Sequence, residues 1–306
     1  MILATKTLTA IEQALQNDQG ARYRFFLEKT LPLAKDAYNP EEDDWRDHLG
    51  ASLIGRECSR ELWYSFHWST LKRFDGRMLR LFNRGHLEEA RFVALLLMID
   101  CAVWQVTAEG KQFRVDGHKG HFGGSLDGVI RGLPDLPDEA VLAEFKTHND
   151  KSFAKLVSDG VMAAKWEHFV QMQIYMGKNS LRWALYGAVN KNDDMLHLEL
   201  VQFDASTYQR YLDRSEMIID AIDPPPRIST TPGFYKCKFC DHAQLCHQLP
   251  GYKIALTCRT CLYSSICNDG KWQCQQTMPP ESLSSEKQRV GCEKYQLNPV
   301  VTINKP

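Results

Sequence analysis

The chain has 306 residues, a formal net charge of −1 and a hydrophobic fraction of 43%. This length suits one large domain with an appendage, or two domains, and the apolar residues suffice for a real core. The near-zero net charge excludes a globally basic DNA-binding protein and leaves local patches for that role. No apolar run is long enough to span a membrane, and no signal sequence is visible, so we expect a cytoplasmic protein.

The first half of the chain changes from helical to strand patterns. Residues 1–50 contain two short helical patterns and an acidic run at 41–44, which we interpret as a solvated loop. Ser52 could cap a helix extending to about Trp68, and a longer helix is predicted over residues 78–98. Strands are predicted at residues 103–106, 111–115, 124–131 and 140–146.

The second half continues this alternation and ends in a cysteine-rich tail. Helical periodicity returns at residues 150–156 and 166–176, strands fit 181–189 and 195–203, and a helix over 205–222 ends at three prolines. Eight of the ten cysteines lie between Cys237 and Cys292. In the absence of a secretion signal, this clustering favours metal ligation over disulfides.

One local basic run precedes and enters the long predicted helix. It comprises Lys72, Arg73, Arg77, Arg80 and Arg84. Such a run can contact nucleic-acid phosphates, and it is equally consistent with a solvated helix face.

Three charged residues carry the strongest chemical signal. Asp127 is flanked by glycines, which allow a backbone to approach a ligand closely. Strand side chains alternate, so Glu144 and Lys146 project together while Phe145 points the other way. Two carboxylates can hold Mg²⁺ or Mn²⁺ through oxygen, and a lysine can orient or activate a water, as a metal-dependent phosphodiesterase requires. A surface ion pair is the alternative, but unused charges in an apolar strand are costly.

Two predicted helices add polar candidates. His86 is a candidate metal ligand with Glu89 one turn further on, or else an ordinary helix-surface histidine. Gln171 and Tyr175 share a helix face at i, i+4, where the amide could bind a phosphate or a metal-bound water and the phenol could donate to DNA. An amphipathic packing helix would show the same spacing.

The order of these residues resembles the PD-(D/E)XK nuclease superfamily, specifically its RecB-like exonuclease branch. The motifs D-G, E-x-K and Q-x-x-x-Y are present, whereas the G-x-x-H motif is replaced by the shorter Arg84-Gly85-His86. The resemblance implies an α/β fold with a mixed central β-sheet flanked by helices, like that of restriction endonucleases. It also implies Mg²⁺ or Mn²⁺ bound by Asp127 and Glu144, with help from His86 and the Phe145 carbonyl.

The implied activity is that of a DNA exonuclease that leaves 5′-phosphate and 3′-hydroxyl ends. Lys146 would position the attacking water, and Gln171 and Tyr175 would orient the DNA or the metal shell. A structure-specific endonuclease and a non-catalytic DNA-binding scaffold are the alternatives. The expected partner is DNA, and a recombination, repair or replication protein or a second copy of the chain is compatible with this family.

A first set of cysteines brackets the nuclease motifs. Cys237, Cys240 and Cys246 form C-x₂-C-x₅-C, one thiolate short of a four-ligand site. The segment around Cys58 resembles the first-cysteine motif of iron–sulfur nucleases, which include CRISPR-associated exonucleases and AddB-type nuclease domains. Ser59 departs from it, since the family usually has proline there. The resemblance implies a 4Fe–4S cluster that closes the fold; zinc with His242 or His247 as fourth ligand is the alternative.

A second set follows in the tail. Cys258, Cys261, Cys274 and Cys292 are predicted to bind Zn²⁺, with Cys267 able to replace either distal ligand. Cys101 is expected to be a core thiol. The predicted organisation is a helical segment at 1–50, a nuclease core at 51–250 and a zinc-binding module at 251–306.

Overall fold

The computed structural model describes residues 1–38, 45–71 and 73–303, so the predicted loop at 41–44 lies outside the described residues. The chain forms two compact units, each assembled from three stretches. Unit 1 contains Met1–Asp43, Phe74–Val115 and Ser125–Gln209, and unit 2 contains Asp44–Arg73, Asp116–Gly124 and Arg210–Pro306. These boundaries do not coincide with those expected at residues 50 and 250.

Unit 1 is built on a six-stranded mixed sheet. Its strands lie in the order β1 (Ile2–Leu3), β9 (Leu196–Gln202), β8 (Trp183–Asn190), β7 (Leu136–His148), β6 (Gly128–Leu133) and β3 (Ala102–Trp104). Only the β7–β8 pair is parallel, and the other four pairs are antiparallel. This mixed sheet confirms the predicted α/β class.

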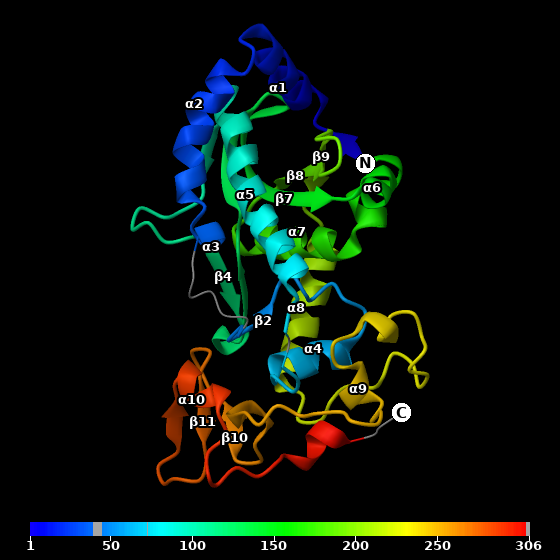
Figure 1. Cartoon of the computed structure of the whole chain (residues 1–306). Helices are drawn as coiled ribbons and strands as arrows, with labels where there is room; N and C mark the ends of the chain where they lie inside the picture. The colour runs from blue at the N-terminus through cyan, green and yellow to red at the C-terminus, as the bar shows by residue number, and fades with distance from the viewer. Residues whose placement is uncertain (39–44, 72, 304–306) are drawn as a thin grey trace. The chain divides into compact units, whose positions relative to one another are not determined.

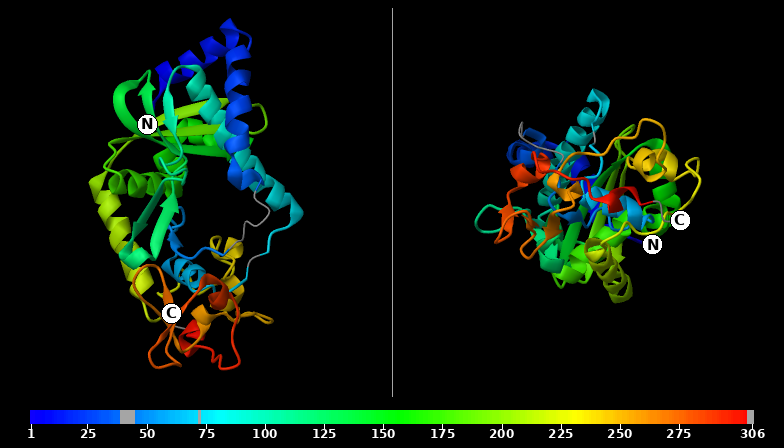
Figure 2. Two further views of the ribbon diagram at one scale, coloured as in Figure 1. Left: turned by 90° about the vertical axis from the view of Figure 1, so that its left-hand side faces the viewer. Right: turned by 90° about the horizontal axis from the view of Figure 1, so that it is seen from below.

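Helices supply the other layers of unit 1. They are α1 (Thr5–Asn17), α2 (Ala21–Thr30), the 3₁₀ turn η1 (Leu31–Leu33), α3 (Lys35–Tyr38), α5 (Gly76–Met98), α6 (Asp150–Ala164) and α7 (Trp166–Lys178). Asp75 caps α5, because its carboxylate accepts the Met78 N–H at 2.8 Å. Helices α2 and α5 lie side by side, as Figures 1 and 2 show.

The alternation of side chains along β7 divides apolar from polar packing. Phe145 points to the side of α5, where its ring stacks on Phe92 with centroids 4.8 Å apart. Glu144 and Lys146 project from the opposite face, where Gln171 of α7 contacts Glu144. The sheet is therefore flanked by helices on both faces, and its polar face meets α7.

Unit 2 consists of short elements. They are β2 (Leu49–Gly50), α4 (Ser59–Phe66), η2 (His118–Gly120), β5 (Phe122–Ser125), η3 (Cys237–Phe239), α9 (Ala243–Cys246), η4 (Cys258–Thr260), β10 (Ser264–Ile266), β11 (Trp272–Cys274), β12 (Glu281–Leu283), α10 (Ser285–Arg289) and η5 (Pro299–Thr302). Strands β10, β11 and β12 form an antiparallel sheet. Besides β5, whose last residue belongs to unit 1, β4 (Arg114–Gly117) and α8 (Ala205–Asp220) contain residues of both units.

A buried arginine organises the interior of unit 2. Arg259 is 2% exposed, and its guanidinium lies 3.6 Å from the ring centroid of Trp68. It donates hydrogen bonds to the carbonyl oxygens of Phe66 and Asp47, both at 3.0 Å. A buried guanidinium needs such partners, so these contacts link η4 to the segment that precedes the long helix.

Two sequence predictions were wrong in detail. The helix expected from Ser52 begins at Ser59, because residues 50–56 form successive turns and Cys58 takes the N-cap position. Ser52 instead accepts a hydrogen bond from Arg46. The strand expected at 124–131 is two strands, β5 and β6. The strand is interrupted between them, where the Leu126 N–H donates to the Phe113 carbonyl.

None of the described helices has the length and hydropathy to cross a membrane.

Candidate functional site

The site forms where the pairing between β6 and β7 stops. Gly128 is paired with Ala143, so the next residues along the two strands are Asp127 and Glu144. Asp127 leaves the ladder, and its Oδ2 accepts the Phe145 N–H at 2.7 Å. A Cβ on residue 128 would lie 3.0 Å from the Trp104 carbonyl oxygen, so glycine permits this close packing. The aspartate thus replaces the missing strand partner of β7.

Glu144 is fully buried and held from two sides. Its Oε2 accepts a hydrogen bond from Nε2 of Gln171 at 3.1 Å. Its Oε1 lies in an ion pair with Nζ of Lys146. A buried carboxylate is costly without such partners, so Gln171 and Lys146 together keep Glu144 in place.

The Lys146 ammonium lies among three oxygen-bearing groups. Besides its ion pair with Glu144, Nζ donates to the Phe145 carbonyl oxygen at 3.1 Å and lies 3.9 Å from Oδ2 of Asp127. The Lys146 side chain is 27% exposed, so the cluster opens to solvent on its lysine side. Two carboxylates and one carbonyl are the oxygen donors that hard divalent cations prefer.

The charges in this cluster shift one another's protonation. Burial raises the pKa of Glu144 above its usual value; Lys146 opposes this shift, and Asp127 adds to it. Burial by itself lowers the pKa of Lys146, but the attraction of Glu144 and Asp127 is stronger, and the pKa ends above its usual value. Lys146 is therefore a cation at neutral pH, suited to orienting a water or stabilising an anion rather than accepting a proton.

Helix α7 adds a second polar group. Tyr175 is 2% exposed, one turn after Gln171. Burial raises the pKa of its phenol well above the usual range, and the nearby Glu144 and Asp127 raise it further. The phenol therefore keeps its proton beside the carboxylates and can act as a hydrogen-bond donor.

The predicted ligand His86 lies on α5 and is partly buried. Across the described residues, no three His, Cys, Asp or Glu side chains are gathered at the spacing of metal ligands. A role for His86 beside Asp127 and Glu144 therefore stays a prediction.

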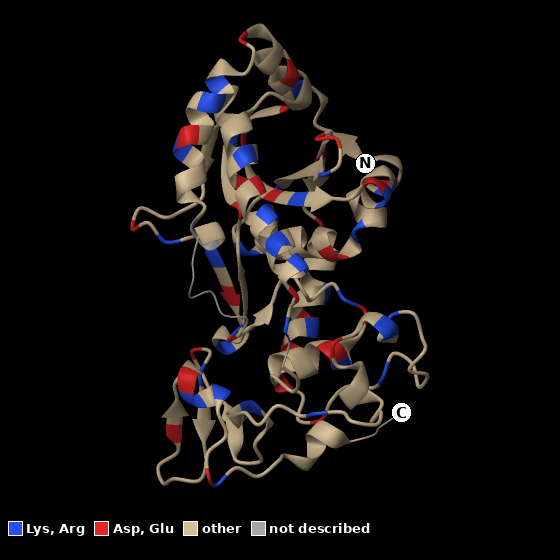
Figure 3. Ribbon diagram, viewed as in Figure 1, with Lys and Arg blue, Asp and Glu red and all other residues tan. Residues whose placement is uncertain are grey.

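The basic run lies largely on the same helix. Arg77, Arg80 and Arg84 are exposed and follow one side of α5 at i, i+3 and i+7, where Figure 3 shows a stretch of basic residues. Arg73 is exposed before the helix, and Lys72 lies outside the described residues. This surface can contact phosphates.

Sequence reasoning missed a buried polar network beside Lys146. The Tyr186 hydroxyl bonds Nε2 of His148 at 2.9 Å and Nδ1 of His168 at 2.8 Å. Burial lowers the pKa of His148 to about 4 and that of His168 to about 2, so both imidazoles are neutral. Residue spacing could have predicted this network. His148 follows Glu144 and Lys146 at the two-residue period of a strand, and His168 precedes Gln171 by one helical turn.

The four cysteines of the first set all lie in unit 2. Cys58 occupies the N-cap position of α4, whereas Cys237, Cys240 and Cys246 lie on or beside η3 and α9. Burial raises the pKa of the Cys240 thiol to about 12, with contributions from the neighbouring Cys58 and Cys246. Burial also raises the pKa of Cys237, again with contributions from Cys246 and Cys58. Cys58 thus lies close enough to Cys237 and Cys240 to influence the pKa values of their thiols. A shared cluster site for the four cysteines stays a prediction.

The alternative zinc ligand His242 is otherwise engaged. Its Nε2 bonds the Ser65 hydroxyl and its Nδ1 the Thr70 hydroxyl, both at 2.8 Å. With both ring nitrogens in hydrogen bonds, His242 is poorly placed to replace a thiolate.

Cys101 is 4% exposed and its thiol donates to the Gly132 carbonyl at 3.4 Å, in keeping with a core position.

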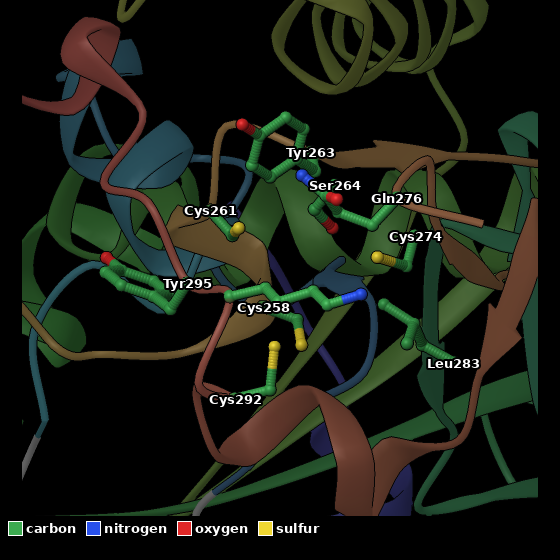
Figure 4. Close-up of a pocket in the computed structure, with 10 residues that line it drawn as sticks. Cys258, Cys261, Tyr263, Ser264, Cys274, Gln276, Leu283, Cys292 and Tyr295 are labelled. Atoms are coloured by element: carbon green, nitrogen blue, oxygen red, sulfur yellow. The ribbon is translucent and has the colours of Figure 1, made fainter.

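Four of the five tail cysteines line one cavity, shown in Figure 4. They are the predicted set, Cys258, Cys261, Cys274 and Cys292. Burial and the other three thiols raise the pKa of Cys258 to about 11.

Comparisons with known proteins give only distant likenesses. No protein family's sequence profile and no curated protein matches the chain. Crystal structures of LHK-Exo, an alkaline exonuclease from Laribacter hongkongensis, with and without dAMP, align with TM-score 0.42 at 17% identity, covering 56% of this chain and 86% of theirs. The crystal structure of SSO0001 aligns with TM-score 0.37 at 15% identity, covering 74% of this chain and 96% of that one. Likenesses at this level do not assign a function.

Proposed function

We propose that the protein is a Mg²⁺- or Mn²⁺-dependent deoxyribonuclease whose active centre is built on Asp127, Glu144 and Lys146. The observation that carries this proposal is the cluster of two carboxylates and a carbonyl around a lysine, at the point where β7 loses its β6 partner. Acidic and basic groups are concentrated there in a largely buried layer, where Glu144 is fully buried. Such a cluster is costly for folding, which favours a chemical use for it.

The donor set fits a hard divalent cation. Asp127, Glu144 and the Phe145 carbonyl would supply oxygen ligands, and His86 is a further candidate from α5. When bound, such a cation polarises a phosphate and lowers the pKa of a water. Lys146 would hold the attacking water and stabilise charge on the phosphate, since its pKa keeps it protonated.

The residues on α7 would support this chemistry. Gln171 fixes the carboxylate of Glu144 through one oxygen, leaving the other toward Lys146. Tyr175 would donate its phenolic hydrogen to a DNA phosphate or to the metal shell. The exposed arginines of α5 would attract the DNA backbone.

We infer exonuclease action with 5′-phosphate and 3′-hydroxyl products from the motif resemblance. A role in recombination, repair or replication, a partner protein and self-assembly belong to the same inference. Cys58, Cys237, Cys240 and Cys246 would hold a 4Fe–4S cluster, which would tie α4 to the segment after the triple proline. The proximity of Cys58 to the other three thiols, 179 residues or more away in sequence, supports this set.

Cleavage of end-labelled linear DNA with Mn²⁺ tests the proposal. The wild type should digest single- or double-stranded substrate from its ends and spare covalently closed circles. Asp127→Ala and Lys146→Ala should be inactive, whereas Gln173→Ala, a buried position of α7 whose hydrogen bonds avoid Glu144, should stay active.

Other outcomes separate the alternatives. Cutting of closed circles or of branched DNA would indicate an endonuclease. A wild type that binds DNA without cutting any substrate would leave only the non-catalytic scaffold.

A further inference from the structure

The tail holds a small cavity lined in part by thiols. The cavity has a volume of about 20 Å³, enough for a single water-sized occupant, which needs about 10–15 Å³. Cys258, Cys261, Cys274 and Cys292 line it from three segments of the chain, as Figure 4 shows. A cavity of this size, rich in thiols, suits one metal ion.

Backbone hydrogen bonds hold the segments that carry these thiols. The Gly291 N–H donates to the Leu256 carbonyl at 2.8 Å, which brings the residue before Cys292 to the start of η4. Further on, the Leu262 N–H donates to the Gln296 carbonyl at 2.7 Å. These hydrogen bonds hold the segment that carries Cys292 beside the segment that carries Cys258 and Cys261.

The hairpin of β10 and β11 places Cys274 at the cavity and Cys267 away from it. Cys274 is paired with Ser264, which also lines the cavity. Cys267 lies three residues further along from Ser264, or about 10 Å at strand spacing. Its thiol donates to the Lys271 carbonyl at 3.2 Å, and its own carbonyl accepts a hydrogen bond from Nε2 of His121 at 2.7 Å.

We propose that Cys258, Cys261, Cys274 and Cys292 form a structural Zn²⁺ site and that Cys267 is excluded from it. Among the described residues, these thiols are not gathered at metal-ligand spacing. Each would move toward the cavity centre to form a Zn–S bond of about 2.3 Å. The four thiol protons leave to solvent as the bonds form. The sequence left Cys267 and the two distal cysteines interchangeable, and the hairpin register separates them.

Two other residues of the cavity favour a thiolate-bound cation. Among the described residues, the buried hydroxyl of Ser264 has no hydrogen-bond partner, and it could donate to a thiolate. Lys294 also lines the cavity and would offset the net negative charge of four thiolates around Zn²⁺. The strands here have only three residues each, so a metal would stabilise a module with little regular secondary structure.

The experiment measures zinc in the full-length protein together with thiol reactivity. The wild type, Cys267→Ser and the nuclease variant Asp127→Ala should each retain one zinc per chain, whereas Cys274→Ser and Cys292→Ser should lose it or bind it at least tenfold more weakly. Cobalt substitution of the wild type should give the absorption of a tetrahedral thiolate site. Because the proposed function requires Asp127→Ala to be inactive, retention of zinc by this variant separates the zinc proposal from the proposed function.

Alkylation of the native wild type needs no variant and covers the case in which the serine variants fail to fold. Cys267 should react, and the other four tail cysteines should react only after a chelator removes the zinc. Protection of Cys267 with alkylation of Cys274 or Cys292 would overturn the ligand assignment. Absence of zinc from wild type purified without chelators, or a disulfide between Cys258 and Cys292, would overturn the site itself.

Discussion

Gln171 and Glu144 are 27 residues apart in the chain, yet Nε2 of Gln171 lies 3.1 Å from Oε2 of Glu144 in the buried layer between α7 and the sheet. This contact joins the helix motif to the strand motif. It orients the carboxylate so that its other oxygen faces Lys146. The geometry of the proposed centre therefore depends on a residue that need not touch the substrate.

Gln171→Ala should lower nuclease activity about 10- to 100-fold, because a buried carboxylate loses a hydrogen bond worth about 1–3 kcal/mol. Gln173→Ala is the matched control. Gln173 is equally buried on α7 but bonds the Gln202 carbonyl and the Asp204 N–H. Both variants should lose stability in urea unfolding, and only Gln171→Ala should lose activity. Equal activity losses would show that the effect is general destabilisation.

Asp127→Asn and Asp127→Ala should be separable by stability. Asparagine keeps an oxygen that can accept the Phe145 N–H, whereas alanine leaves this N–H without its partner. Both variants should be at least a hundredfold less active, because each loses the negative charge. Only Asp127→Ala should also lose about 1–3 kcal/mol of unfolding free energy. An active Asp127→Asn would contradict a role in metal binding.

Divalent metal should stabilise the protein more at high pH than at low pH. The folded state holds the Glu144 proton more tightly than the unfolded state does, so above the usual carboxyl pKa of 4.5 stability falls as pH rises through the raised value. Mn²⁺ would compete with that proton and relieve the cost. The rise in melting temperature on adding Mn²⁺ should therefore grow from pH 5 to pH 8, and Glu144→Gln should abolish this trend. A metal effect independent of pH in the wild type would argue against Glu144 as a ligand.

The buried histidines should make the protein sensitive to acid. Burial lowers the pKa of His148 from its usual 6.5 to about 4, so its contribution to stability is complete above 6.5 and is lost as pH falls toward 4. The loss for His148 alone is about 3 kcal/mol. Urea unfolding at pH 7 and pH 4.5 should show this decrease, and His148→Gln should reduce it. A second variant, Tyr186→Phe, should be less stable at both pH values, because two imidazole nitrogens lose their shared partner.

Cys58→Ser should remove the colour of anaerobically purified protein. The four proposed cluster ligands include Cys58, so its loss should bleach the absorption of a 4Fe–4S cluster and lower the melting temperature. Cys101→Ser is the control, since this buried thiol bonds the Gly132 carbonyl in unit 1. Iron and sulfide analysis of both variants makes the comparison quantitative. Colourless wild type with two zinc ions would favour zinc at both cysteine sites.

The sequence predicted most of the secondary structure because strand and helix periodicities are local. The longest predicted helix, 78–98, corresponds to Gly76–Met98, and the predicted strand 140–146 lies within β7. The prediction of secondary structure was wrong where a hydrogen bond to a residue outside the segment interrupts a strand. The strand expected at 124–131 breaks because the Leu126 N–H bonds Phe113, and no pattern within that segment records this contact.

In the candidate site, too, some features follow from local sequence patterns and others only from tertiary contacts. The alternation of β7 alone placed Glu144 and Lys146 on one side and Phe145 on the other. Tertiary structure supplied the contact of Gln171 with Glu144 and the capping of the Phe145 N–H by Asp127. These depend on how strands and helices pair, which residue spacing cannot express.

The cysteine tail shows where the sequence by itself reaches its limit. Spacing identified five tail cysteines as one metal-binding group and could not separate Cys267 from Cys274, because both lie at acceptable distances along the chain. The pairing of Cys274 with Ser264 places the Cys274 thiol at the cavity, whereas Cys267 lies further along the hairpin and does not line the cavity. The sequence alone determined the kinds of ligand and the alternation of side chains along β7. The register between strands decided which side chains meet. Hydrogen bonds between segments distant in the chain set that register, so local spacing does not predict it.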